Sequence, residues 1–78
     1  MYILTQDQKK IVNTEKVAMI EMVRTTGQVY AVQNIGEHLD EYIILGKYGN
    51  PKGALLDIFI ALRNGNSSYE MPQSTEGE

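Results

Sequence analysis

The chain has 78 residues, a net charge of −3 and no cysteine. A chain of this length forms one small domain with a marginal core, and the lack of cysteine excludes disulfides and thiolate metal sites as its support. The acidic balance argues against a dedicated nucleic-acid binder and against a protein that binds anionic membranes. Self-association is then the remaining way to supplement the core.

The N-terminal residues predict neither secretion nor membrane insertion. They contain no basic segment followed by a long apolar segment, so no secretory signal peptide is expected. No apolar run approaches the roughly 20 residues that a membrane-spanning helix needs. We therefore expect a cytoplasmic protein without membrane contact. Residues 1–72 are expected to form a single domain, and the polar residues 73–78 a disordered tail.

The first part of the chain has the pattern of a β-hairpin. Residues 2–5 are apolar and β-prone, residues 6–9 are a polar turn, and residues 10–13 are a second short strand. A second polar break covers residues 13–16. Residues 17–25 fit a strand by alternation and a helix by the spacing of Val17, Ile20 and Val23. We predict a strand, because a turn over residues 25–28 leads into the β-rich residues 28–34.

Residues 35–40 are polar and acidic and predict a loop, and residues 41–48 predict a strand. Gly46 within that strand indicates a bulge or a close approach of another backbone segment. Residues 50–65 predict a helix that begins at the N-cap Asn50 with Pro51 in its first turn and closes at Gly65. Residues 68–71 predict a final edge strand that ends at Pro72.

The predicted helix carries more apolar surface than one contact face needs. Its expected inward stripe, flanked by two alanines, consists of Leu55, Ile58, Phe59 and Leu62. Leu56 and Ile60 lie about 100° or more from the centre of that stripe. One interpretation is that a strongly curved sheet wraps the helix, or that the two side chains are exposed without consequence. The other is that Leu56 and Ile60 form the centre of an interface with a second copy or another protein.

Residues 37–41 contain the single histidine of the chain, His38, among the carboxylates of Glu37, Asp40 and Glu41. These groups could offer an imidazole and oxygens to a divalent cation, but their spacing matches no metal motif, so a solvated loop is expected. No serine stands in a nucleophile motif, and no glycine-rich loop could cradle a phosphate. We predict no enzymatic activity, no metal and no cofactor.

A nucleic-acid-associated factor is the alternative function. Lysines gather near the first hairpin, at Lys9, Lys10 and Lys16, and four tyrosines could include a stacking platform, namely Tyr2, Tyr30, Tyr42 and Tyr48. The other interpretation is that the tyrosines pack on strands and the lysines protect strand edges. The overall acidity favours this second interpretation.

Three segments carry a resemblance to a group of proteins, namely Tyr2-Ile3-Leu4-Thr5-Gln6-Asp7, Ile44-Leu45-Gly46-Lys47-Tyr48, and the helix positions Ala54, Leu55, Ile58 and Leu62. In these residues the chain resembles small uncharacterised proteins of Gram-positive bacteria, their phages and mobile elements. The likeness rests on packing and turn residues, and it implies no activity. The chain departs from those proteins at the helix start, where Asn50-Pro51-Lys52-Gly53 replaces an acidic first turn.

These patterns together predict an α+β domain with one curved antiparallel sheet of five or six strands and one C-terminal helix across it, analogous to a reduced pleckstrin-homology-like half-barrel. The expected core consists of Ile3, Ile11, Ile20, Met22, Val29, Ala31, Ile43, Leu45, Leu55, Ile58, Phe59 and Leu62. The expected function is that of a non-catalytic interaction or structural accessory protein, which forms homo-oligomers, with a dimer favoured.

Overall fold

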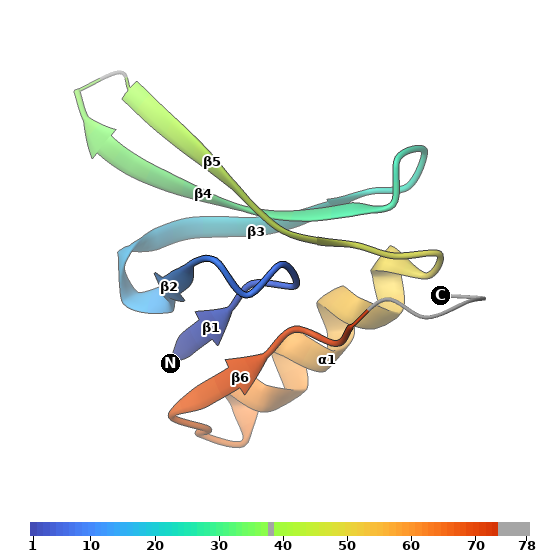
Figure 1. The fold of residues 1–78 in the computed structure, drawn as a ribbon. Coiled ribbons are helices and arrows are strands. Elements are labelled where there is room, and N and C mark those ends of the chain that lie inside the picture. The colour runs from blue at the N-terminus through green and yellow to red at the C-terminus, as the bar shows by residue number, and fades with distance from the viewer. Residues whose placement is uncertain (38, 74–78) are drawn as a thin grey trace.

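The computed structural model of the protein describes residues 1–37 and 39–73. Within them the predicted α+β class is confirmed (Figure 1). In chain order the elements are β1 (Tyr2–Leu4), β2 (Ile11–Asn13), the 3-10 turn η1 (Thr14–Lys16), β3 (Val17–Val23), β4 (Gln28–Gly36), β5 (Leu39–Lys47), α1 (Pro51–Arg63) and β6 (Ser68–Glu70). His38 and residues 74–78, and with them most of the predicted tail, lie outside the described residues.

The six described strands form two three-stranded sheets, so the expectation of one continuous antiparallel sheet is wrong in this detail. One sheet has the order β2-β1-β6 and the other the order β3-β4-β5. The turn η1 redirects the chain after β2, because the Asn13 side chain accepts a hydrogen bond from the Glu15 N–H at 3.0 Å. β6 returns after the helix and pairs with β1 in parallel, which an all-antiparallel sheet does not allow.

The first hairpin forms as predicted, but the face assigned to β2 is wrong. Ile3 pairs with Val12, and residues directly opposite in an antiparallel pair share a face. The buried Ile3 therefore brings Val12 into the core, and Ile11, one residue away, points to solvent. The strand has only three residues, so its composition did not determine which of them faces inward.

The loop between β1 and β2 connects the two sheets. The Gln6 N–H donates to the Leu45 carbonyl at 2.7 Å, and the Gln6 side chain accepts from the Lys47 N–H at 2.8 Å. Thr5, which is buried, donates its hydroxyl to Asp7 at 2.6 Å. That hydrogen bond and one from the Lys9 N–H lower the pKa of Asp7.

The second sheet confirms the strands predicted around residues 17–34 and 41–48. Ile20 and Met22 lie opposite Ala31 and Val29, so the predicted faces hold. Gly27 has φ +79° at the turn between β3 and β4, and a Cβ there would lie 2.3 Å from the Tyr48 carbonyl oxygen. The register of β4 against β5 shifts beside Gly46, so the bulge predicted there is confirmed. The alternative, a close backbone approach, is not what the structure has, because the atoms nearest to Gly46 belong to the Tyr48 side chain.

The predicted loop over residues 35–40 is mostly strand. β4 continues to Gly36 and β5 begins at Leu39. The pairing of β3 with β4 ends at Val17 opposite Gln33, so the hairpin beyond that point is a two-stranded ribbon that projects away from α1 (Figure 1). Its polar composition reflects exposure to water on both faces, and this composition was mistaken for that of a loop.

The core lies where α1 meets the two sheets. It is formed by Ile3, Val12, Val29, Ala31, Ile43, Leu45, Tyr48, Ala54, Ile58 and Met71, with Ile20 and Met22 partly buried against it. Of the expected members, Ile11, Phe59 and Leu62 are exposed and Leu55 is half-buried. The helix is thus rotated relative to the prediction, and its buried residues are Pro51, Ala54, Ile58 and Ala61.

Candidate interaction site

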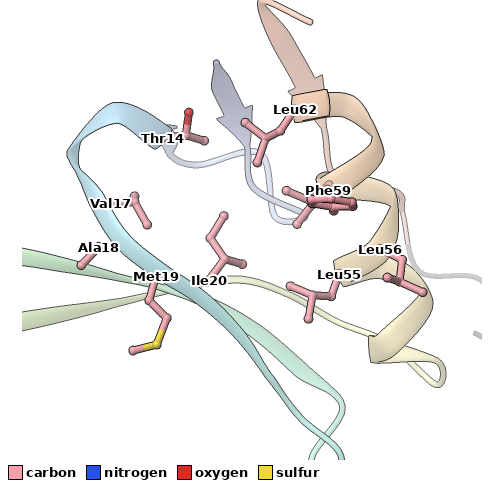
Figure 2. A pocket seen from close by; sticks show the side chains of 10 residues that line it. Thr14, Val17, Ala18, Met19, Ile20, Leu55, Leu56, Phe59 and Leu62 are labelled. Carbon is pink, nitrogen blue, oxygen red and sulfur yellow. The ribbon is translucent and has the colours of Figure 1, made fainter. Parts of the chain in front are cut away.

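An apolar groove of about 500 Å³ lies between α1 and the beginning of β3 (Figure 2). The groove is lined by ten residues, namely Thr14, Val17, Ala18, Met19, Ile20, Leu55, Leu56, Ile58, Phe59 and Leu62. Nine of these ten side chains are apolar. The tenth, Thr14, donates its hydroxyl to the Met1 carbonyl at 2.9 Å, so it does not need a partner in the groove.

The helix wall of the groove follows from how α1 is fixed. Asn50 caps the first turn by accepting from the Gly53 N–H at 3.1 Å, and Pro51 follows without an N–H to satisfy. Ala54 and Ala61 then face the core. At 100° per residue, this orientation turns Leu55, Phe59 and Leu62 toward β3, where Figure 2 shows them opposite Val17 and Ile20.

The rotation of the helix has a packing cause. The space between the sheets is already filled by large side chains such as Leu45 and Met71, both almost fully buried. A helix can approach such a layer closely only through small residues, and the buried residues Ala54 and Ala61 provide them on either side of Ile58. Ile58 is 1% exposed, whereas its neighbour Phe59 is 56% exposed. The largest side chains of α1 are thus left in the groove and on the solvent side.

The strand wall of the groove is an unprotected sheet edge. β3 is the outer strand of its sheet, and none of the described strands pairs with its free side. Its sequence contains one charged residue, Glu21, which accepts a hydrogen bond from the Tyr30 hydroxyl on β4. That hydrogen bond raises the pKa of Tyr30. Natural sheet edges normally carry charges or proline against pairing with other chains, and β3 carries little of either.

The predicted interface residues Leu56 and Ile60 are 48% and 42% exposed. Leu56 belongs to the groove lining, although its side chain points away from β3 (Figure 2), and Ile60 lies further round the helix. The sequence therefore identified two exposed residues on this helix. It missed Phe59 and Leu62, because their size suggested burial, and it missed the strand wall, because the neighbour of the helix was not known.

A positive charge lies beside the groove. The Arg63 guanidinium carbon is 5.7 Å from the centre of the Phe59 ring, within reach of a cation–π interaction. Lys52 lies on the same side of the helix, about two turns before Phe59 and three turns before Arg63, and Lys16 directly precedes β3. The groove therefore combines an apolar floor with a rim that carries three cations.

The tyrosines considered for a stacking platform are distributed over different parts of the molecule. Tyr2 is exposed on the β2-β1-β6 sheet, where it borders a shallow pocket of about 250 Å³. Tyr30 and Tyr42 meet edge to face at 5.7 Å on the other sheet. Tyr48 is buried and donates its hydroxyl to the Pro72 carbonyl at 2.7 Å. These positions do not form one continuous surface for bases.

The predicted acidic cluster around His38 is only partly described by the structure. Residues 1–37 and 39–73 contain no group of three metal-binding side chains close enough to hold an ion. Glu37, Asp40 and Glu41 are exposed at the end of the β4–β5 hairpin, and His38, the fourth member of the predicted cluster, is outside the described residues. Among the helices in the described residues, none is long and apolar enough to cross a membrane.

Comparison with protein-family models, with curated proteins and with solved structures finds no match to this chain.

Proposed function

We propose that this protein is a non-catalytic interaction protein that self-associates through the groove and the solvent side of α1. The observation that carries the proposal is the helix itself, which buries its alanines and exposes Leu56, Phe59, Ile60 and Leu62. A soluble protein rarely leaves so many large apolar side chains together without a partner. The lack of cysteine suits a reducing compartment, and we propose the cytoplasm as its location.

The four exposed side chains favour association by an amount that their exposure sets. Full burial of one large apolar side chain contributes roughly 1.5–3 kcal/mol, and these residues are 42–56% exposed, so each contributes about half of that. Burial of all four would offset part of the cost of association, which is about 4–15 kcal/mol. A second copy is the natural occupant, because a domain of 78 residues has a small core and gains stability from association.

Sedimentation equilibrium tests the proposal. The wild type is expected to show a mass that rises with concentration toward the dimer. The double variant Leu56→Lys with Ile60→Lys, and separately Phe59→Ser with Leu62→Ser, should remain at the monomer mass, because each removes apolar area from this side of α1. Ile11→Lys is the matched control, since Ile11 is an exposed apolar residue on the other sheet. A wild type that stays monomeric at every accessible concentration would overturn the proposal.

The alternative, a nucleic-acid-associated factor, stays a prediction. Its expected tyrosine platform is divided between two sheets and the core, and no further observation favours it. Salt-sensitive retention on a single-stranded nucleic-acid column at low ionic strength would support this alternative, and elution in the void volume would count against it.

A further inference from the structure

The projecting end of the β4–β5 hairpin, together with Glu41 at its base opposite Gln33, is called the arm and consists of residues 34–37 and 39–41. Within it Asn34 pairs with Asp40 and Gly36 with Leu39, and neither pair has a third strand beside it. Ile35 and Leu39 on the arm are 56% and 60% exposed. A two-stranded ribbon gains little stability of its own in water, so two exposed aliphatic side chains at its end indicate a contact with another surface.

The arm and the groove are opposite in charge. Three of the residues of the arm are acidic, Glu37, Asp40 and Glu41, and none is basic. The rim of the groove carries Lys16, Lys52 and Arg63, and three acidic residues adjoin its lining in the sequence, namely Glu15, Glu21 and Asp57. Of these, Glu21 accepts a hydrogen bond from the Tyr30 hydroxyl and Asp57 lies near Tyr69, so the cations of the rim face one further acidic residue, Glu15. The two surfaces also match in the kind of apolar contact they offer, because aliphatic side chains project from the arm and a concave apolar surface lies between α1 and β3.

We infer that the groove of one copy receives the arm of a second copy. The inference rests on the proposed self-association and names the segment that occupies the site. Ile35 and Leu39 pack against Phe59 and Leu62, and the carboxylates of the arm lie beside the cations of the rim. Charge complementarity of this kind fixes the orientation of two partners and accelerates their encounter.

The contact is between molecules. Figure 1 shows the arm extending from the end of the sheet that is remote from α1, so the hairpin of one copy does not reach its own groove. When two copies exchange arms reciprocally, both grooves are filled and the assembly closes as a dimer. The free edge of β3 forms one wall of the groove, and the inserted arm shields it from pairing with other chains.

A charge-exchange experiment tests the inference by sedimentation velocity. The arm variant is Asp40→Lys with Glu41→Lys, and the groove variant is Lys52→Glu with Arg63→Glu. Each variant alone is expected to self-associate about tenfold more weakly than the wild type, because like charges meet at both contacts. An equimolar mixture is expected to recover dimers, because every arm then meets a groove of opposite charge.

The apolar part of the contact is tested by Ile35→Ser with Leu39→Ser, with Tyr42→Ser as the matched control on the outer face of β5. The first variant should lose association while its thermal unfolding below the association range stays unchanged. If the wild type dimerises but neither the arm variants nor the mixture changes its affinity, the arm is not the occupant, although self-association through α1 stands. If the wild type is monomeric, both the inference and the proposed function are overturned.

Discussion

The two sides of α1 differ in a way that reverses the usual association of size with burial. The inward side presents Ala54 and Ala61 around Ile58 and joins the core between the two sheets. The outward side presents Leu56, Phe59, Ile60 and Leu62 to solvent and to the groove. Small residues therefore mark the closest approach of the helix within the molecule, whereas its large residues stay exposed.

The largest expected effect contrasts two neighbouring residues of α1. Ile58→Ala should reduce the free energy of unfolding by about 2–5 kcal/mol, because it leaves a cavity in the core. Phe59→Ala removes a larger side chain from a half-exposed position and should cost less than about 1 kcal/mol in the monomer. Urea unfolding of dilute protein measures both changes. Equal losses for the two variants would contradict the orientation of the helix.

The second contrast adds volume instead of removing it. Ala61→Leu should lower the free energy of unfolding by about 1–3 kcal/mol, because the close contact of the helix with the sheets has no room for the larger side chain. Ile60→Leu, one position earlier on the outward side, should leave it unchanged within about 0.5 kcal/mol. Thermal unfolding followed by circular dichroism distinguishes the two. A stabilising Ala61→Leu would show that the inward side is loosely packed.

A smaller effect is the loss of stability at alkaline pH that Tyr69, near Asp57 of α1, is expected to cause. Burial, together with the nearby charge of Asp57, raises the pKa of Tyr69 above its ordinary value of 10.0. Because the pKa is higher in the folded state, the protonated Tyr69 hydroxyl contributes to the free energy of unfolding. This contribution is fully present below pH 10 and is lost as the pH rises through the folded pKa. Tyr69→Phe should therefore lose less stability in alkali than the wild type does.

Equilibrium unfolding at neutral pH and above pH 10 measures this difference. Tyr2→Phe is the control on the neighbouring sheet, since Tyr2 is exposed. Identical alkaline profiles for the wild type and for Tyr69→Phe would contradict the assignment.

The smallest expected effect lies on the outward side. Arg63→Lys keeps the charge at the end of the helix but loses the planar group over Phe59, and it should cost about 0.5 kcal/mol at most. The measurement is the ring-proton chemical shift of Phe59, which should move, together with urea unfolding, which should barely change. An unchanged Phe59 shift would show that the two side chains do not interact in solution.

The elements with strong local signals could be predicted from the sequence, whereas their assembly could not. The cap at Asn50, the turn at Gly27 and the bulge at Gly46 each depend on a few neighbouring residues. The face of β2 depends on the partner of Ile3, which is a contact across the hairpin. Two sheets replace one because η1 redirects the chain and β6 pairs with β1, and neither event has a local signature.

The candidate site was predictable only in part for the same reason. Leu56 and Ile60 could be recognised as exposed, because no single face accommodates every large residue of the helix. The burial of Ala54 and Ala61 in place of Phe59 and Leu62 depends on how closely the helix approaches a layer that other elements build. The arm was missed because polar residues on a two-stranded ribbon have the composition of a loop.

The most direct test of the central claim, that the outward side of α1 is a contact between copies, is an isotope-filtered NOE experiment. Labelled and unlabelled chains are mixed, and only contacts between different copies are observed. The account predicts NOEs that connect the Phe59 ring and the Leu62 methyl groups of one copy with protons of another. A sample that sediments as a dimer yet shows such intermolecular NOEs only from the outer face of the β2-β1-β6 sheet would contradict it.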